Sequence, residues 1–124
     1  MTIPAHAVVW TEVPCTDIDR AAAFYDAVLK TKLFKEETGP NPVYMFPTDP
    51  PMQGIAGHLY PGKPAGDGSG PTIHFNSPDK LEHALDRVRT AGGQVLSDPI
   101  QIPPGRFAYC LDLDGNSISI FEGA

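Results

Sequence analysis

The segment Leu111–Glu122 reads L-D-L-D-G-N-S-I-S-I-F-E and combines two acidic residues with a glycine and an alternating run. Acidic residues beside a glycine can belong to a calcium loop, which would need further oxygen ligands and a bidentate Glu at its twelfth position. Counted from Asp112, that position is Gly123. The D-G-N run that begins at Asp114 instead tolerates positive φ, so the segment predicts a hairpin that leads into a strand over Ser117–Phe121.

The chain repeats itself at one fixed offset, which places Ile18 on Leu81 in a helical pattern and Asp49 on Asp112 in a turn. Agreement of helix, turn and strand positions at a single offset is improbable by chance, so the sequence predicts two copies of one module. The other matched pairs are Ala21 with Ala84, Ala22 with Leu85, Tyr25 with Val88, Pro40 with Pro103, Tyr44 with Phe107, Phe46 with Tyr109 and Ile55 with Ile118.

Each copy is expected to contain one strand, one helix and three further strands. The first helix follows the cap sequence T-D-I-D that begins at Thr16, and the second is expected to start with Ser77 as N-cap and Pro78 as its first residue. The sequence therefore predicts a single α+β domain over 1–124, with module one at about 6–60, a Gly/Pro-rich linker at 61–71 and module two at about 72–122. The strands are expected at Val8–Val13, Lys32–Glu37, Val43–Pro47, Gly54–Leu59, Thr72–Asn76, Gln94–Leu96, Arg106–Leu111 and Ser117–Phe121.

Composition excludes several classes of partner and location. The net charge is -6 and the chain has no Lys/Arg cluster, which argues against nucleic acid and anionic membranes as partners. No apolar run is long enough to span a bilayer and the first residues lack the pattern of a signal peptide, so we expect a cytoplasmic protein. Cys15 and Cys110 are expected to be reduced, structural thiols.

Three segments together resemble the vicinal oxygen chelate superfamily, which includes glyoxalase I, bleomycin resistance proteins, fosfomycin resistance enzymes and extradiol dioxygenases. Val8–Tyr25 reads V-V-W-T-E-V-P-C-T-D-I-D-R-A-A-A-F-Y, and Leu81–Gly93 reads L-E-H-A-L-D-R-V-R-T-A-G-G. The run from Leu111 to Ile120 is similar to the family's D-P-D-G-N-x-I-E-L signature, with Leu113 in place of proline and Ser119 in place of glutamate. The resemblance implies two βαβββ modules that form a cupped mixed sheet.

The resemblance also implies where a metal would be held, by one His or Glu from the first and last strand of each module. The family's ligand in the first strand lies five residues before the position of Cys15, which is Trp10, and the terminal signature gives Ser119. The repeat offset supplies Ile73 and Ala56 for the other two positions. Indole, hydroxymethyl and alkyl groups are poor ligands for divalent ions, so we expect neither the usual metal site nor another cofactor.

A shifted metal site is the alternative. Glu12 lies two residues from Trp10 and His58 two from Ala56, so strand alternation places each on the face of its vacant position. His74 is adjacent to Ile73 and should face the other way unless a β-bulge turns it inward. Together these three residues would form a His₂Glu set for one divalent metal ion.

Aromatic residues in the predicted strands suggest a pocket for a planar or apolar small molecule, although each of them could equally fill the core. Arg106 follows P-P-G and is either an anion contact at the opening or an ordinary surface arginine. The predicted ligand-binding residues are Trp10, Glu12, Phe46, His58, Phe75, Arg106, Tyr109, Ser119 and Phe121.

Three functions are consistent with these features. The first is a metal-free small-molecule-binding protein of the bleomycin-resistance kind. The second is a metal-dependent glyoxalase-like lyase or dioxygenase, in which Glu12 is a metal ligand or a base. The third is an interaction module with a filled cleft. The resemblance also implies a homodimer whose paired modules complete the cups.

Overall fold

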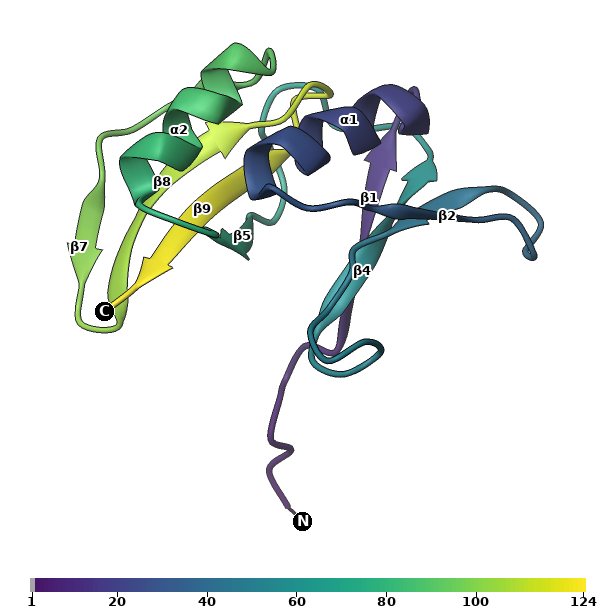
Figure 1. Ribbon diagram of the computed structural model, residues 1–124, viewed down its shortest axis with the longest axis horizontal. Coiled ribbons are helices and arrows are strands. Elements are labelled where there is room, and N and C mark those ends of the chain that lie inside the picture. Colours follow the sequence, from purple (N-terminus) through teal and green to yellow (C-terminus); the bar gives the residue numbers. More distant parts are fainter. Residues whose placement is uncertain (1) are drawn as a thin grey trace.

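The computed structural model describes residues 2–124 and contains two sheets, each covered on one face by a helix (Figure 1). The predicted α+β architecture of two repeated modules is therefore confirmed. The elements of module one are β1 (Trp10–Cys15), α1 (Ile18–Leu29), β2 (Phe34–Glu36), β3 (Val43–Met45) and β4 (Ala56–Pro61). Those of module two are β5 (Ile73–Asn76), α2 (Leu81–Thr90), β6 (Gln94–Val95), β7 (Ile100–Ile102), β8 (Gly105–Leu111) and β9 (Ser117–Gly123).

The two sheets have the same topology. In module one the strand order is β1-β4-β3-β2, with β1 parallel to β4, and in module two it is β5-β9-β8-β6, with β5 parallel to β9. Module two has one strand more than predicted, because β7 pairs with β8 inside the loop expected between Ser97 and Gly105. No helix within residues 2–124 has the length and apolar character needed to cross a membrane.

The helices begin at Ile18 and Leu81, the pair that the repeat matches, but their caps differ. Asp17 caps α1 by accepting a hydrogen bond from the N–H of Arg20 at 3.2 Å. The prediction that Ser77 caps the second helix is wrong, because α2 does not begin until Leu81. The N–H of Leu81 donates to Glu122 Oε1 at 3.0 Å, so a carboxylate from β9 caps this helix.

One hydrophobic core joins the two modules, because α1 and α2 pack against each other above both sheets (Figure 1). Both cysteines belong to it as unpaired thiols. Burial raises the pKa of Cys15 to about 12, helped by the nearby carboxylates of Asp114 and Asp112, and raises the pKa of Cys110 to about 11. Tyr25 is fully buried, and its ring lies 5.4 Å from that of Phe46 and 5.3 Å from that of Phe75, centroid to centroid.

The turn between β8 and β9 also holds the modules together. The hairpin predicted there is confirmed, and Asp112, which is only 5% exposed, accepts four hydrogen bonds. Three come from its own turn, and the fourth comes from the hydroxyl of Tyr25 in α1 at 2.7 Å. Asn116 in turn donates its side-chain N–H to the carbonyl of Pro14 at 2.9 Å. The acidic turn is therefore a clasp between module two and the end of β1.

One contact between sheet and helix is repeated in the two modules. The hydroxyl of Tyr44 in β3 donates to Asp19 of α1 at 2.7 Å, and Arg106 in β8 donates two hydrogen bonds to Glu82 of α2, each at 2.6 Å. Asp19 and Glu82 each follow the first residue of their helix, so the helices keep the predicted offset. Tyr44 corresponds to Arg106 and not to Phe107, which means that the offset slips by one residue in this strand.

Candidate functional site

We call the face of each sheet that lies opposite its helix the open face. In module one, Val13, Cys15 and Leu59 point toward the core, so the residues that alternate with them lie on the open face. Direct pairing of Trp10 with Ala56 and of Glu12 with His58 confirms this arrangement across β1 and β4. The open face of module one thus carries Trp10, Glu12, Phe34, Glu36, Val43, Met45, Ala56 and His58.

Trp10, His58 and Glu12 form one hydrogen-bonded row on this face. The indole N–H of Trp10 donates to Nδ1 of His58 at 2.9 Å, and Nε2 of His58 lies 3.1 Å from Oε1 of Glu12. Because Nδ1 accepts a hydrogen bond, a neutral His58 carries its hydrogen on Nε2 and donates it to Glu12. The structure places Glu12 on the face of Trp10 and His58 on the face of Ala56, as strand alternation predicted, and the row fixes the orientation of the imidazole.

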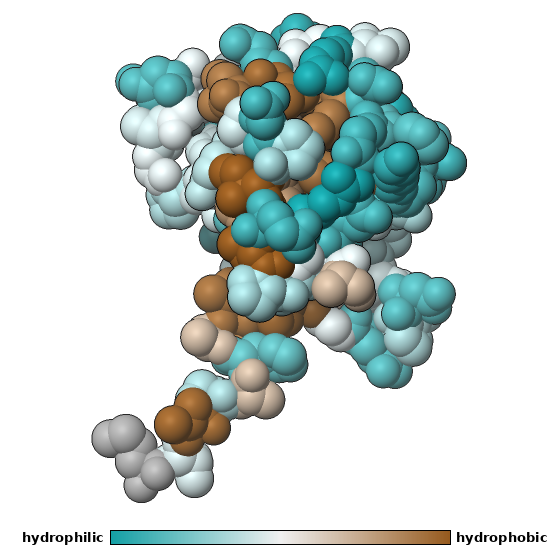
Figure 2. Space-filling model, turned by 90° about the vertical axis from the view of Figure 1, so that its left-hand side faces the viewer, coloured by the Kyte–Doolittle hydropathy of each residue, from teal (hydrophilic) through white to brown (hydrophobic). Residues whose placement is uncertain are grey.

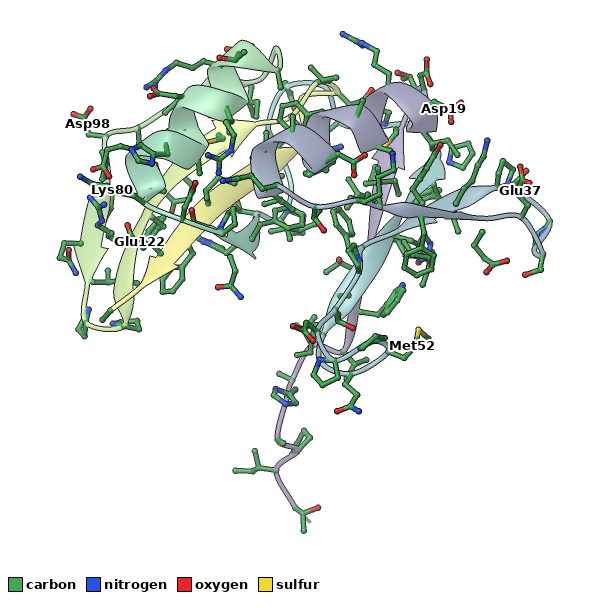
Figure 3. The ribbon with its side chains drawn as sticks, viewed as in Figure 1. Asp19, Glu37, Met52, Lys80, Asp98 and Glu122 are labelled. Carbon is green, nitrogen blue, oxygen red and sulfur yellow. The ribbon has the colours of Figure 1, made fainter. Side chains whose placement is uncertain are left out.

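Two hollows lie on either side of the row. The first, about 270 Å³, is lined by apolar side chains of the open face together with the loop that carries Met52. The second, about 420 Å³, is lined by Glu12, Glu36 and His58 with the loop after β2. Figure 3 shows Met52 and Glu37 on the loops at these two ends of the sheet. Four residues that line these hollows were not among the predicted site residues: Phe34, Glu36, Met45 and Met52. Alternation within F-K-E and V-Y-M was the signal that could have revealed Phe34, Glu36 and Met45.

The open face of module two is aromatic. His74, Ser119 and Tyr109 are direct neighbours across β5, β9 and β8, and Phe107 lies on the same face. The ring of His74 is 5.2 Å from that of Phe107, and Phe107 is 5.2 Å from Tyr109, both in edge-to-face contact. Ser119 is fully buried, and its hydroxyl has no hydrogen-bond partner among residues 2–124. Phe121 lies two residues beyond Ser119 along β9, on the same face.

The structure corrects the expected direction of His74. Ser119 pairs with His74, whereas Ala56, which the repeat matches with Ser119, pairs with Trp10. His74 therefore takes the open-face place that the sequence assigned to Ile73, because the offset slips by one residue in β5. A one-residue slip reverses the face of every side chain in a strand.

Three other predicted ligand residues lie on the helix side. Arg106 does not line the open face, because its guanidinium is held by Glu82 and by Glu122, the latter at 2.8 Å. These two carboxylates raise the pKa of Arg106, and the pKa of Glu82 falls to about 2 through its hydrogen bonds with Arg106. Phe46 and Phe75 stack at 5.2 Å beside Tyr25. Both nevertheless border a third hollow of about 650 Å³ at the junction of β1 and β5, and Phe46 also lines the first hollow.

The residues present do not fit the family's metal site. The side chains at its four positions, with His74 taken in place of Ile73, are an indole, a methyl group, an imidazole and a hydroxyl, and only the imidazole is a good ligand. The alternative set of Glu12, His58 and His74 also fails to assemble, because His74 is not grouped with the other two closely enough to share one ion. Within residues 2–124, no three His, Cys, Asp or Glu side chains are grouped so that they could hold a metal ion.

Comparison with known proteins agrees with the geometry. The profile of the Glyoxalase/Bleomycin resistance protein/Dioxygenase superfamily matches residues 6–120. CFP32 of Mycobacterium bovis and of Mycobacterium tuberculosis, which carries the name of a glyoxylase, is 27% identical over 128 residues and 94% of this chain. The chain spans 44% of the length of these curated relatives.

Solved structures show the same fold. A glyoxalase/bleomycin resistance protein from Albidiferax ferrireducens superposes with a TM-score of 0.64 at 22% identity, covering 96% of this chain and 100% of the other. A glyoxalase I mutant from Zea mays gives 0.71 at 18% identity, covering 92% of this chain and 45% of the other. Since the superfamily profile covers nearly the whole sequence, the chain belongs to the glyoxalase/bleomycin resistance protein/dioxygenase superfamily, the vicinal oxygen chelate group.

Proposed function

We propose that the protein binds a small, partly apolar molecule on the open faces of its sheets and does so without the usual metal of its superfamily. The observation that carries this proposal is the row of Trp10, His58 and Glu12. Trp10 stands where a metal-dependent relative would have a ligand, and its N–H is bonded to the nearest imidazole. A metal ion at His58 Nδ1 would have to break that hydrogen bond, because one lone pair cannot serve both.

The hollows beside the row suit a ligand of this kind. Binding sites for small molecules are concave and mostly apolar, with a few polar groups that set orientation. Trp10 and Phe34 are 41% and 44% exposed, so their rings are available for contact. Glu12 and His58 supply polar groups within the same face.

A ligand library read by thermal shift tests the proposal. Compounds that bind the open face are expected to raise the melting temperature, by an amount that grows with ligand concentration. Trp10→Ala should abolish these shifts, whereas Ile3→Ala, which truncates a side chain that is 95% exposed, should leave them unchanged. The proposal fails if no compound stabilises the protein, or if the shifts survive in Trp10→Ala.

The metal-dependent alternative is tested on the same protein. We expect protein purified without chelator to contain far less than one equivalent of Zn, Fe, Mn or Ni by elemental analysis, and we expect metal addition to leave its melting temperature unchanged. Near-stoichiometric metal that is lost in Glu12→Ala or His58→Ala would instead identify a lyase or dioxygenase with a shifted site.

We further propose a homodimer in which a second copy completes each cup. Figure 2 shows hydrophobic residues exposed along one side of the molecule and onto its N-terminal segment, where Val8 is 57% exposed. Exposed apolar surface of this extent is typical of interaction sites. Light scattering at micromolar concentration should give about twice the monomer mass of 13.3 kDa, and the monomer mass itself would contradict the dimer. A cytoplasmic location stays a prediction from the sequence.

A further inference from the structure

The two hollows of module one are the two ends of one groove. On each of the four strands, one residue lines the first hollow and the residue two positions away lines the second. In β2, for example, Phe34 lines the first and Glu36 the second. Residues two apart in a strand share a face and lie about 7 Å apart. The groove therefore runs along the strands, and one molecule can occupy both ends. The remaining pairs are Met45 with Val43, Ala56 with His58 and Trp10 with Glu12.

The first end of the groove is apolar. Its walls are the indole of Trp10, the ring of Phe34 and the thioether of Met45, and Met52 closes it from the loop before β4. Met52 is 83% exposed, and it adopts a positive φ of 63°. Methionine side chains adapt their shape to different apolar partners, so this end suits a flat or compact hydrocarbon group without demanding one outline.

The second end is negatively charged. Glu12 and Glu36 both border it, and no lysine or arginine is among its lining residues. Hydrogen bonds from the hydroxyl and N–H of Thr38 to Glu36 lower the pKa of Glu36, so this carboxyl is ionised at neutral pH. The nearest lysine in the sequence, Lys35, points to the opposite face, where its Nζ lies 3.6 Å from Asp19. Within the groove, the two carboxylates are therefore paired with no lysine or arginine among residues 2–124, and the one basic side chain at this end, His58, lies 3.1 Å from Glu12 and leaves Glu36 without a basic partner.

We propose that this groove selects organic cations, in which an apolar body fills the end at Trp10 and a protonated amine occupies the end that Glu12 and Glu36 border from the two edge strands of the sheet. This rests on the proposed binding function and names the chemical class of its ligand. The amine must lie about 7 Å from the centre of the apolar group, which corresponds to a spacer of a few bonds. An anion of the same shape is disfavoured, because its charge would meet two carboxylates and neither a lysine nor an arginine among the lining residues.

Three probes that share one body test this selectivity on the full chain: 3-phenylpropylamine, 3-phenylpropan-1-ol and 3-phenylpropanoate. Trp10 is the only tryptophan, so its emission reports directly on the apolar end of the groove. At pH 7 the amine should bind about tenfold more tightly than the alcohol, since two partly exposed charge pairs together contribute about 1.4 kcal/mol. The acid should bind more weakly than the alcohol.

Glutamine variants separate charge from shape. Glu12→Gln and Glu36→Gln should each weaken amine binding about threefold, as expected for one exposed charge pair, and leave alcohol binding unchanged. Gln at position 12 can still accept the hydrogen bond of His58. The matched control is Glu37→Gln, which removes the same charge at the position next to Glu36. The side chain of Glu37 pairs with Lys35. This variant should change amine affinity by less than about twofold, because exposed charges are screened.

The outcomes distinguish the ligand class from the proposed function. If the alcohol or the acid binds as tightly as the amine, or if the glutamine variants bind the amine normally, the selectivity for cations is wrong while small-molecule binding stands. If none of the three probes changes the emission of Trp10 and none shifts the melting temperature, the cation proposal is overturned. The proposed function is then overturned as well if the wider ligand library also gives no shift.

Discussion

Asp112→Ala is expected to lower the free energy of unfolding by about 3–5 kcal/mol, because it removes the acceptor of four hydrogen bonds from a buried site. The substitution leaves the hydroxyl of Tyr25 buried without a partner, and it releases two backbone N–H groups of the turn. For a chain of this length the melting temperature should fall by about 10–20 °C. Urea denaturation followed by circular dichroism measures the free energy directly.

Asp114→Ala is the matched control, since Asp114 lies in the same turn and is bonded to the exposed Thr16. Its loss should cost about 1 kcal/mol. Tyr25→Phe should cost less than Asp112→Ala, because the turn keeps its other three hydrogen bonds. A value for Asp112→Ala within about 1 kcal/mol of the Asp114 control would show that the clasp contributes little beyond an ordinary turn.

Gly115→Ala has the second largest expected effect, about 2–4 kcal/mol of destabilisation. Gly115 adopts a φ of 74°, which costs an alanine about 1 kcal/mol. A Cβ at this position would also collide with the backbone of Gly66 in the linker, and neither backbone can move without disturbing the hydrogen bond from Gly68 N–H to the Gly115 carbonyl at 2.8 Å. Urea titration measures the loss.

The linker itself supplies the control for this prediction. Gly70 also has a positive φ, 91°, but a Cβ there meets no atom within 4 Å. Gly70→Ala should therefore show only the conformational cost of about 1 kcal/mol. Equal destabilisation of the two variants would mean that the contact between Gly115 and Gly66 does not constrain the linker.

The helices and the order of strands could be predicted from the sequence because they depend on local patterns. The repeat matches Ile18 with Leu81, and these two residues are the first residues of the two helices. The cap of α2 could not be predicted, because its acceptor is Glu122, which is 41 residues away in the sequence. Ser77 had the right composition for a cap, but its side chain is bonded to the carbonyl of Asp79.

The part of the site on β1 and β4 could be predicted from alternation within one pair of strands. The parts that depend on the exact register of other strands could not. Alternation alone places Glu12 with Trp10, and the parallel pairing of β1 and β4 brings His58 to them. His74 was assigned to the wrong face, because the repeat slips by one residue in β5 and side-chain direction reverses with each residue. Arg106, expected either at the opening or on the surface, is held on the helix side by Glu82 and Glu122. The acidic end at Glu36 was missed, because its hollow depends on a loop whose conformation no pattern fixes.

The cap on α2 also has a consequence for the order of events when the chain is made. Glu122 lies in β9, yet it holds the first turn of a helix that leaves the ribosome much earlier. Tyr25 and Pro14 are synthesised earlier still, and they form their hydrogen bonds with Asp112 and Asn116 only after those residues have been synthesised. Neither module can complete these hydrogen bonds while β9 is still inside the ribosome, so the nascent chain reaches its final structure only after the hairpin of β8 and β9 has emerged.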